Sequence, residues 1–137
     1  MLKLSSQQYA GVVGSLQSAA ASGGSDKRRF TRMEIQAPVT VAAMTDSQVT
    51  RCLIALSRDV SLSGIGLCQT AKFAPREKFL VSLPCDKEQI VLVCLPMFCR
   101  PLAEGIYAIG AQFESVADPA KSQQFWTLAA TVLKTAS

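Results

Sequence analysis

Two stretches of the sequence contain residue types that could bind a ligand. The first is SDKRRFTRM at residues 25–33, where four basic side chains fall within the six positions from Lys27 to Arg32. A guanidinium group pairs with a phosphate through two hydrogen bonds, so this stretch could form a pocket for one small anionic ligand. A solvated basic patch and a grip on a nucleic-acid polymer are the other interpretations of this stretch.

The second stretch is RDVSLSG at residues 58–64, which contains Asp59, Ser61 and Gly64. A carboxylate accepts hydrogen bonds, and a serine hydroxyl can both donate and accept them. A glycine allows a close approach that a Cβ would prevent. The same residue types are also typical of a turn that closes a β-hairpin, and that role is compatible with ligand binding.

The composition argues against catalysis. The chain has 137 residues, a formal net charge of +4 and no histidine, so the commonest general base and metal ligand is missing. Its five cysteines are an odd number and form no C-x-x-C pair, which argues against a disulfide framework and a zinc site. We therefore predict a single globular binding protein that is not an enzyme, needs no metal or cofactor, and keeps its cysteines as buried thiols in a reducing compartment.

The sequence also predicts a cytoplasmic protein that does not insert into membranes. The longest apolar run, residues 90–99, is too short to cross a bilayer and contains Pro96. The first residues are interrupted by Gln and Ser and lack the apolar region of a signal peptide.

Period-two alternation of apolar residues predicts six short strands without intervening helices. The predicted strands are residues 34–44, 50–61, 64–69, 77–84, 88–101 and 105–115. This pattern is typical of a mainly β fold, and an antiparallel barrel is favoured because closure removes exposed strand edges. Pro38, within the first strand, indicates an edge or a bulge.

Two helices are expected to flank the strands. Residues 6–21 place apolar side chains on one helical face, with Ser5 or Ser6 as the cap, but two glycines make this helix marginal. Its apolar face predicts either docking on the rest of the chain or a dimer contact. A second helix is expected to start with Asp118 as N-cap and Pro119 at its first position. The residues expected to seat this helix are Phe125, Trp126, Leu128, Ala129 and Val132.

In combination, Arg28-x-x-x-Arg32 followed by Asp59-x-Ser61-x-x-Gly64 resembles the two ligand-binding motifs of the PilZ domain, the bacterial receptor for cyclic di-GMP. The resemblance runs from about Lys27 to the C-terminal helix and includes the sequences DVSLSGIGL and IGAQF. It implies a PilZ-like six-stranded antiparallel β-barrel. The cyclic di-GMP site that it implies is made by Arg28, Arg32, Asp59, Ser61 and Gly64, extended by Lys27 and Arg29.

The same resemblance implies how such a protein acts. A basic residue before the first motif arginine favours a stacked pair of ligands, and Lys27 holds that place. Residues 1–24 lie outside the resemblance, but the Gly/Ser hinge before the arginines suggests a further step: closure of the arginine loop over the ligand would carry the N-terminal helix to a new place and signal to a protein partner. The sequence thus divides into an N-terminal helical segment with a Gly/Ser hinge, residues 1–24, and a PilZ-like barrel domain with a C-terminal helix, residues 25–137.

Two other functions stay open as alternatives. A PilZ-like scaffold could bind protein partners without any nucleotide. A small barrel that binds single-stranded nucleic acid is less favoured, because the strands are short of aromatic residues interleaved with basic ones. We therefore expect no nucleic-acid polymer as a partner. The sequence decides neither between monomer and homodimer nor among downstream pathways.

Overall fold

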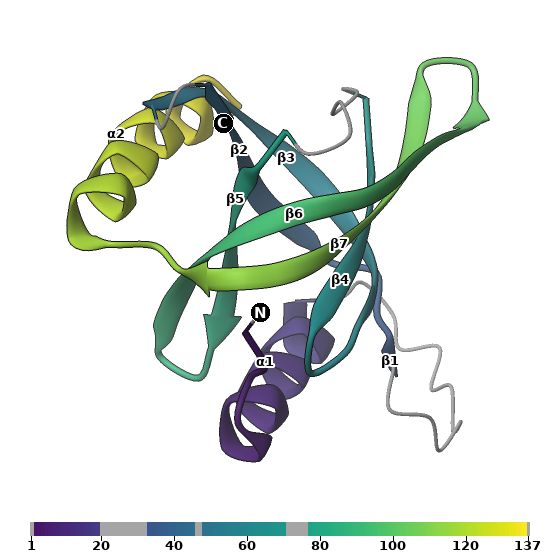
Figure 1. Ribbon diagram of the computed structural model, residues 1–137, viewed down its shortest axis with the longest axis vertical. Coiled ribbons are helices and arrows are strands. Elements are labelled where there is room, and N and C mark those ends of the chain that lie inside the picture. Colours follow the sequence, from purple (N-terminus) through teal and green to yellow (C-terminus); the bar gives the residue numbers. More distant parts are fainter. Residues whose placement is uncertain (1, 20–32, 46–47, 71–76, 137) are drawn as a thin grey trace.

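The chain folds into a β-barrel flanked by two helices (Figure 1). The computed structural model describes residues 2–19, 33–45, 48–70 and 77–136. The helices are α1 (Ser6–Ala19) and α2 (Pro119–Ala136). The strands are β1 (Met33–Glu34), β2 (Pro38–Thr45), β3 (Gln48–Val60), β4 (Gly64–Gln69), β5 (Phe79–Cys85), β6 (Glu88–Ala103) and β7 (Ile106–Val116). These elements follow the predicted segments closely.

Six of the described strands close into an antiparallel barrel, which confirms the predicted fold class. Their order is β3-β2-β5-β6-β7-β4, and the pairing of β4 with β3 closes the ring. The two-residue β1 adds to β3 beyond the end of β2, with Glu34 opposite Asp59. The ring therefore brings the end of β3 beside both β1 and β4.

The predicted edge or bulge at Pro38 corresponds to a gap between β1 and β2, which run along the same side of β3. The buried Ser57 of β3 fills this gap with its hydroxyl, which accepts from the N–H of Ala37 (3.1 Å) and donates to the carbonyl oxygen of Ile35. The N–H of Ser57 in turn donates to the carbonyl of Ala37 (2.8 Å). One side chain thus bridges the interruption close to Asp59.

Helix α1 covers one end of the barrel (Figure 1). Inward-facing side chains such as Phe79, Leu92 and Phe113 fill the barrel and are fully buried. Val12 and Leu16 of α1 are fully buried in the same cluster. Of the two expected roles for this helical face, the structure therefore shows docking on the chain's own barrel.

A reciprocal cap starts α1. The N–H of Gln8 donates to the hydroxyl of Ser5 (3.0 Å), and the N–H of Ser5 donates to Oε1 of Gln8 (2.9 Å). This capping box satisfies two backbone donors at the helix start. Gly11 allows close packing, because a Cβ there would lie 2.7 Å from Sγ of Cys85 at the end of β5.

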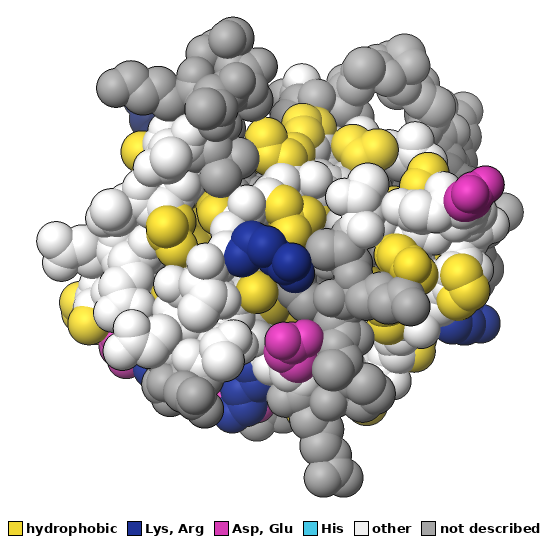
Figure 2. Space-filling view, turned by 90° about the horizontal axis from the view of Figure 1, so that it is seen from above, with side chains coloured by type: hydrophobic (Ala, Val, Ile, Leu, Met, Phe, Trp, Pro, Cys, Tyr) yellow, Lys and Arg dark blue, Asp and Glu magenta, His cyan; other side chains and the backbone are white. Residues whose placement is uncertain are grey.

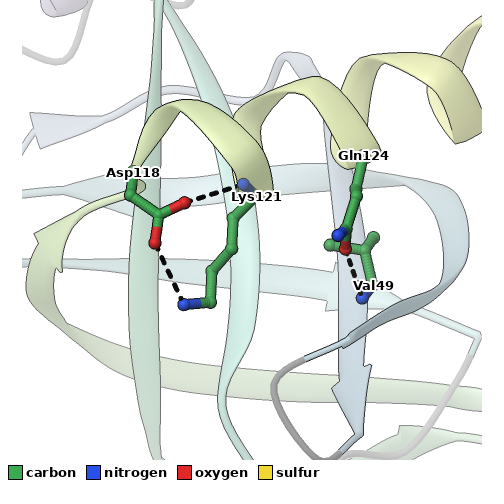
Figure 3. A network of polar contacts seen from close by, with 4 residues as sticks. All are labelled: Val49, Asp118, Lys121 and Gln124. Atoms are coloured by element: carbon green, nitrogen blue, oxygen red, sulfur yellow. Dashed lines mark hydrogen bonds and ion pairs between the residues drawn. The ribbon is translucent and has the colours of Figure 1, made fainter.

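Helix α2 packs on the outside of the barrel, against β3 and, through the fully buried Phe125 and Ala129, against residues of β2, β5 and β6. Trp126, which was expected to help seat the helix, is 38% exposed and meets Phe125 edge-on instead. Figure 3 shows the polar contacts of this helix: Asp118 caps it through the N–H of Lys121 (2.8 Å), as predicted, and Gln124 accepts from the N–H of Val49 (3.3 Å).

All five cysteines are free thiols. Only Cys94 is buried, so the prediction of buried thiols holds for this residue and is wrong for the other four, which are partly exposed. Burial raises the pKa of the Cys94 thiol. Within the described part of the chain, neither helix is both long and apolar enough to span a bilayer.

Candidate ligand-binding site

The Asp59-x-Ser61-x-x-Gly64 motif forms the end of β3 and the tight turn into β4. Both the N–H of Ser61 (2.9 Å) and its hydroxyl (3.3 Å) donate to the carbonyl oxygen of Gly64. Ser61 is 9% exposed and therefore contributes to the turn itself. The predicted turn role is thus present, and it fixes the motif at a defined place on the barrel.

Strand β7 holds this turn from the other side. The N–H of Phe113 donates to the carbonyl oxygen of Ser63 (2.8 Å). Gly64 lies so close to β7 that a Cβ would overlap the carbonyl oxygen of Ala111. Because that obstacle is backbone, a larger residue at Gly64 would have to displace the strand. Gly64 is therefore required by packing, independently of any ligand.

A β-bulge decides which way Asp59 points. Ser57 faces the barrel interior opposite Leu67, and in a regular strand Asp59, two positions on, would face inward as well. The register shifts between these two residues, so that Asp59 pairs with Gly66 on the outer face. The carboxylate lies over Gly66, where a Cβ would come within 2.6 Å of Oδ1. The motif carboxylate is thus presented on the outside of the barrel.

Cross-strand pairing leads from Asp59 over the outer face of the sheet to β6. Gly66 pairs with Gly110 of β7, and Gly110 pairs with Phe98 of β6. The ring of Phe98 lies over Gly110, since a Cβ there would overlap it. The guanidinium carbon of Arg100 lies 4.6 Å from the centre of the same ring.

No role was assigned to Phe98, Arg100 or Gly110 from the sequence. One signal was available: an isolated glycine within a strand, such as Gly110 in IGAQF, indicates a close approach by another group. The partner of that glycine could not be read, because the bulge between Pro96 and Phe98 sets the cross-strand register.

The N-terminal segment contacts the same turn. The N–H of Leu4 donates to the carbonyl oxygen of Leu62 (2.8 Å), and the N–H of Leu2 donates to that of Phe113 (3.0 Å). The hydroxyl of Tyr9 on α1 donates to the carbonyl oxygen of Val60 (3.4 Å). The start of the chain and α1 are therefore joined directly to the backbone that carries the motif.

The four basic residues of the first motif stretch, Lys27, Arg28, Arg29 and Arg32, and the Gly/Ser hinge lie outside the described residues. The backbone that follows them is described: β1 begins directly after Arg32, and its first residue, Met33, pairs with Val60 beside Asp59. The described chain that follows Arg32 therefore starts at the end of β3 that carries Asp59. On the face seen in Figure 2, the described Lys and Arg side chains stand singly among hydrophobic and polar ones.

Comparison with known protein families gives a match over most of the chain. The family model for the PilZ domain matches residues 26–128, a span that includes both motifs. The chain therefore belongs to the PilZ-domain family, the family of cyclic di-GMP receptors that its motifs resemble. No curated protein matches the chain.

Two solved structures are similar in fold. One is the inhibitor of motility MotI/DgrA from Bacillus subtilis, with a TM-score of 0.49 and 12% sequence identity over 77% of this chain and 51% of that one. The other is MrkH from K. pneumonia in its apo state, with a TM-score of 0.46 and 13% identity over 85% of this chain and 55% of that one. The chain spans about half the length of each.

Proposed function

We propose that this protein is a receptor and adaptor that binds cyclic di-GMP and has no catalytic activity of its own. The observation that carries the proposal is the position of Asp59, whose carboxylate is turned to the outer face by a bulge and lies over Gly66. Asp59 pairs on its other side with Glu34 of β1, the strand that begins directly after Arg32. Membership of the PilZ-domain family supports the same ligand.

The chemistry of the ligand matches the two motifs. Cyclic di-GMP carries two phosphates and two guanines, so it offers both anionic groups and purine edges. Arg28 and Arg32 are proposed to bind phosphate, or the O6 and N7 atoms of guanine, because guanidinium groups make paired hydrogen bonds to both. Asp59 is proposed to accept hydrogen bonds from N1–H and N2–H₂ of guanine, and the turn through Ser61 and Gly64 holds it there.

Lys27 and Arg29 are proposed to extend the charge of this site. A stacked pair of ligands doubles the negative charge to be neutralised, and a basic residue directly before Arg28 favours that pair. The ratio of ligand to protein at saturation measures whether one or two molecules bind.

We further propose that ligand binding moves the N-terminal arm, which comprises residues 2–19 with α1, and thereby signals to a protein effector in the cytoplasm. The contacts from Leu4 to Leu62 and from Tyr9 to Val60 support this coupling, because they tie the arm to the backbone of the motif turn. Five free thiols fit a reducing compartment.

Isothermal titration calorimetry with cyclic di-GMP tests the ligand assignment. Wild-type protein should saturate at one or two ligands per chain. Arg28→Ala and Asp59→Ala should each weaken binding by roughly tenfold to hundredfold, the equivalent of one lost hydrogen bond to a charged group. Arg51→Ala is the matched control, since Arg51 is an exposed arginine at the opposite end of β3.

The affinity for cyclic di-AMP distinguishes recognition of the base from attraction of the phosphates, because the two ligands differ only in their bases. Adenine lacks the N1–H donor that Asp59 is proposed to bind, so wild-type protein should bind cyclic di-AMP weakly, and Asp59→Ala should narrow the difference between the two ligands. A folded wild-type protein that gives no heat with cyclic di-GMP would overturn the receptor function and favour the protein scaffold. Affinity that grows with the length of an oligonucleotide and falls steeply with salt would instead favour polymer binding.

A further inference from the structure

The outer surface of the barrel carries a row of four residues on four neighbouring strands. Asp59 of β3 pairs with Gly66 of β4, Gly66 pairs with Gly110 of β7, and Gly110 pairs with Phe98 of β6. All four face outward, because their neighbours Ile109 and Leu67 belong to the core. Two glycines therefore separate a carboxylate from an aromatic ring.

The two side chains of this row lean toward each other over the glycines. A Cβ on Gly66 would lie 2.6 Å from Oδ1 of Asp59, and a Cβ on Gly110 would overlap the ring of Phe98. Their α-carbons stand three strand spacings apart, roughly 14 Å. The two side chains thus lean toward each other, and the two residues between them, Gly66 and Gly110, carry no side chain.

A second row of paired residues lies beside the first on the same four strands. Leu56 of β3 pairs with Cys68 of β4, Cys68 pairs with Ala108 of β7, and Ala108 pairs with Arg100 of β6. The guanidinium of Arg100 lies against the ring of Phe98 from the first row, at 4.6 Å. We call these two rows together the outer platform: its floor is made of small residues, with one edge formed by β3 and the other by β6.

The chemistry of the outer platform matches that of a guanine base. Guanine has N–H donors on one edge, the acceptors O6 and N7 on another, and a flat face that stacks on aromatic rings. Asp59 supplies acceptors on the β3 edge, and Phe98 and Arg100 supply a ring and a donor fork on the β6 edge. Phe98 is 40% exposed and so remains accessible to a base.

We propose that a guanine of the ligand binds on the outer platform, stacked on Phe98 and contacted by Arg100, with Asp59 at its opposite edge. This inference rests on the proposed cyclic di-GMP function and adds β6 as a third part of the site, beyond the two sequence motifs. Packing of an aromatic ring over a cross-strand glycine also stabilises a sheet, so the test has to separate ligand affinity from fold stability.

Affinity for cyclic di-GMP measured on Phe98 variants makes this separation. Phe98→Leu keeps an apolar side chain but removes the ring, and should weaken binding by roughly fivefold to hundredfold, the range of one lost base–aromatic stack. Phe98→Trp keeps a ring and should retain most of the affinity that Phe98→Leu loses. Met97→Ala, at an exposed neighbouring position of β6, is the matched control. Thermal unfolding of each variant reports any change in the fold.

Arg100→Gln tests the platform without removing the ring over Gly110, and should weaken cyclic di-GMP binding without lowering the unfolding temperature. A direct readout comes from Phe98→Trp combined with Trp126→Phe, which leaves one tryptophan, at position 98. Its fluorescence should be quenched on addition of cyclic di-GMP, because guanine would stack on the indole. Trp126 of the wild-type protein, which lies on α2, should not respond.

The two proposals fail in distinguishable ways. Tight binding by wild-type protein that Phe98→Leu and Arg100→Gln both leave unchanged, with no quenching of the tryptophan at position 98, would overturn the platform and leave the receptor function standing. Absence of cyclic di-GMP binding by folded wild-type protein would overturn both.

Discussion

At the scale of single residues, one inserted position in β3 determines what Asp59 can reach. Without the bulge after Ser57 the carboxylate would face the apolar interior, where an ionised group is costly. With the bulge it lies outside, over a glycine that leaves room for it. Gly66 therefore matters through the position it allows Asp59 to take.

The variant Gly66→Ala tests this arrangement. Its Cβ would displace the Asp59 carboxylate, so the affinity for cyclic di-GMP should fall by about tenfold, while the free energy of unfolding changes by less than about 1 kcal/mol because a side-chain tip can move aside. Calorimetry and urea denaturation measure the two quantities. Gly14→Ala is the control, since its Cβ meets nothing within 4 Å. Unchanged affinity in Gly66→Ala would contradict the proposed role of Asp59.

At the scale of elements, α1 is a weak helix by sequence that becomes part of the barrel core. Its glycines disfavour it, while the Ser5–Gln8 capping box and the burial of Val12 and Leu16 stabilise it. Leu16→Ala should therefore lower the free energy of unfolding by roughly 2–5 kcal/mol in urea denaturation. Gln17→Ala, at an exposed position one residue on, should leave it nearly unchanged. Equal stability of the two variants would mean that α1 does not dock in solution.

The start of α2 predicts a pH dependence of stability. The N–H of Lys121, and then its side chain, lower the pKa of Asp118 below its ordinary value of 3.8. Ionised Asp118 therefore stabilises the folded state above that pH, and its contribution is lost as the pH falls through the lowered pKa. Asp118→Asn keeps a capping oxygen but cannot ionise. The difference in unfolding free energy between wild type and this variant should be present at pH 7 and vanish in strong acid; a difference that persists there would contradict the assignment.

The helices and strands were largely predictable from the sequence. The sequence did not show that Asp59 and Phe98 both lie on the outer face of the barrel. Alternating apolar residues and the local cap at Asp118 depend on neighbours in sequence, so the strands and both helices were found. The outward turn of Asp59 and the placement of Phe98 over Gly110 depend on bulges that appear only once strands pair. Helical spacing placed Phe125 on the apolar face of α2 and Trp126 beside it, and the structure buries Phe125 and leaves Trp126 38% exposed.

At the scale of the whole molecule, hydrogen bonds join the candidate site to the N-terminal arm. Leu4 bonds to the turn between β3 and β4, and Tyr9 bonds to the end of β3. A ligand that pulls the residues after α1 toward Asp59 would strain or release these contacts. We propose these hydrogen bonds as the route by which binding on the barrel surface reaches a partner.

Hydrogen–deuterium exchange tests this coupling. If ligand binding moves the arm, the amides of α1 should exchange faster in saturating cyclic di-GMP, while those of α2, on another side of the barrel, should not change. The Asp59→Ala variant at the same ligand concentration is the control and should show little change in α1. Identical exchange of α1 with and without bound ligand would contradict signalling through this helix.

The most direct test of the central claim is an amide-resolved NMR titration of ¹⁵N-labelled protein with cyclic di-GMP. If cyclic di-GMP binds at the two motifs, the amide chemical shifts should change saturably. The changes should be largest at Asp59, Ser61, Gly64 and Gly66 and at residues 27–32, and small at the capping contacts of α2. No saturable shift, or shifts confined to surfaces away from the β3–β4 turn, would contradict it.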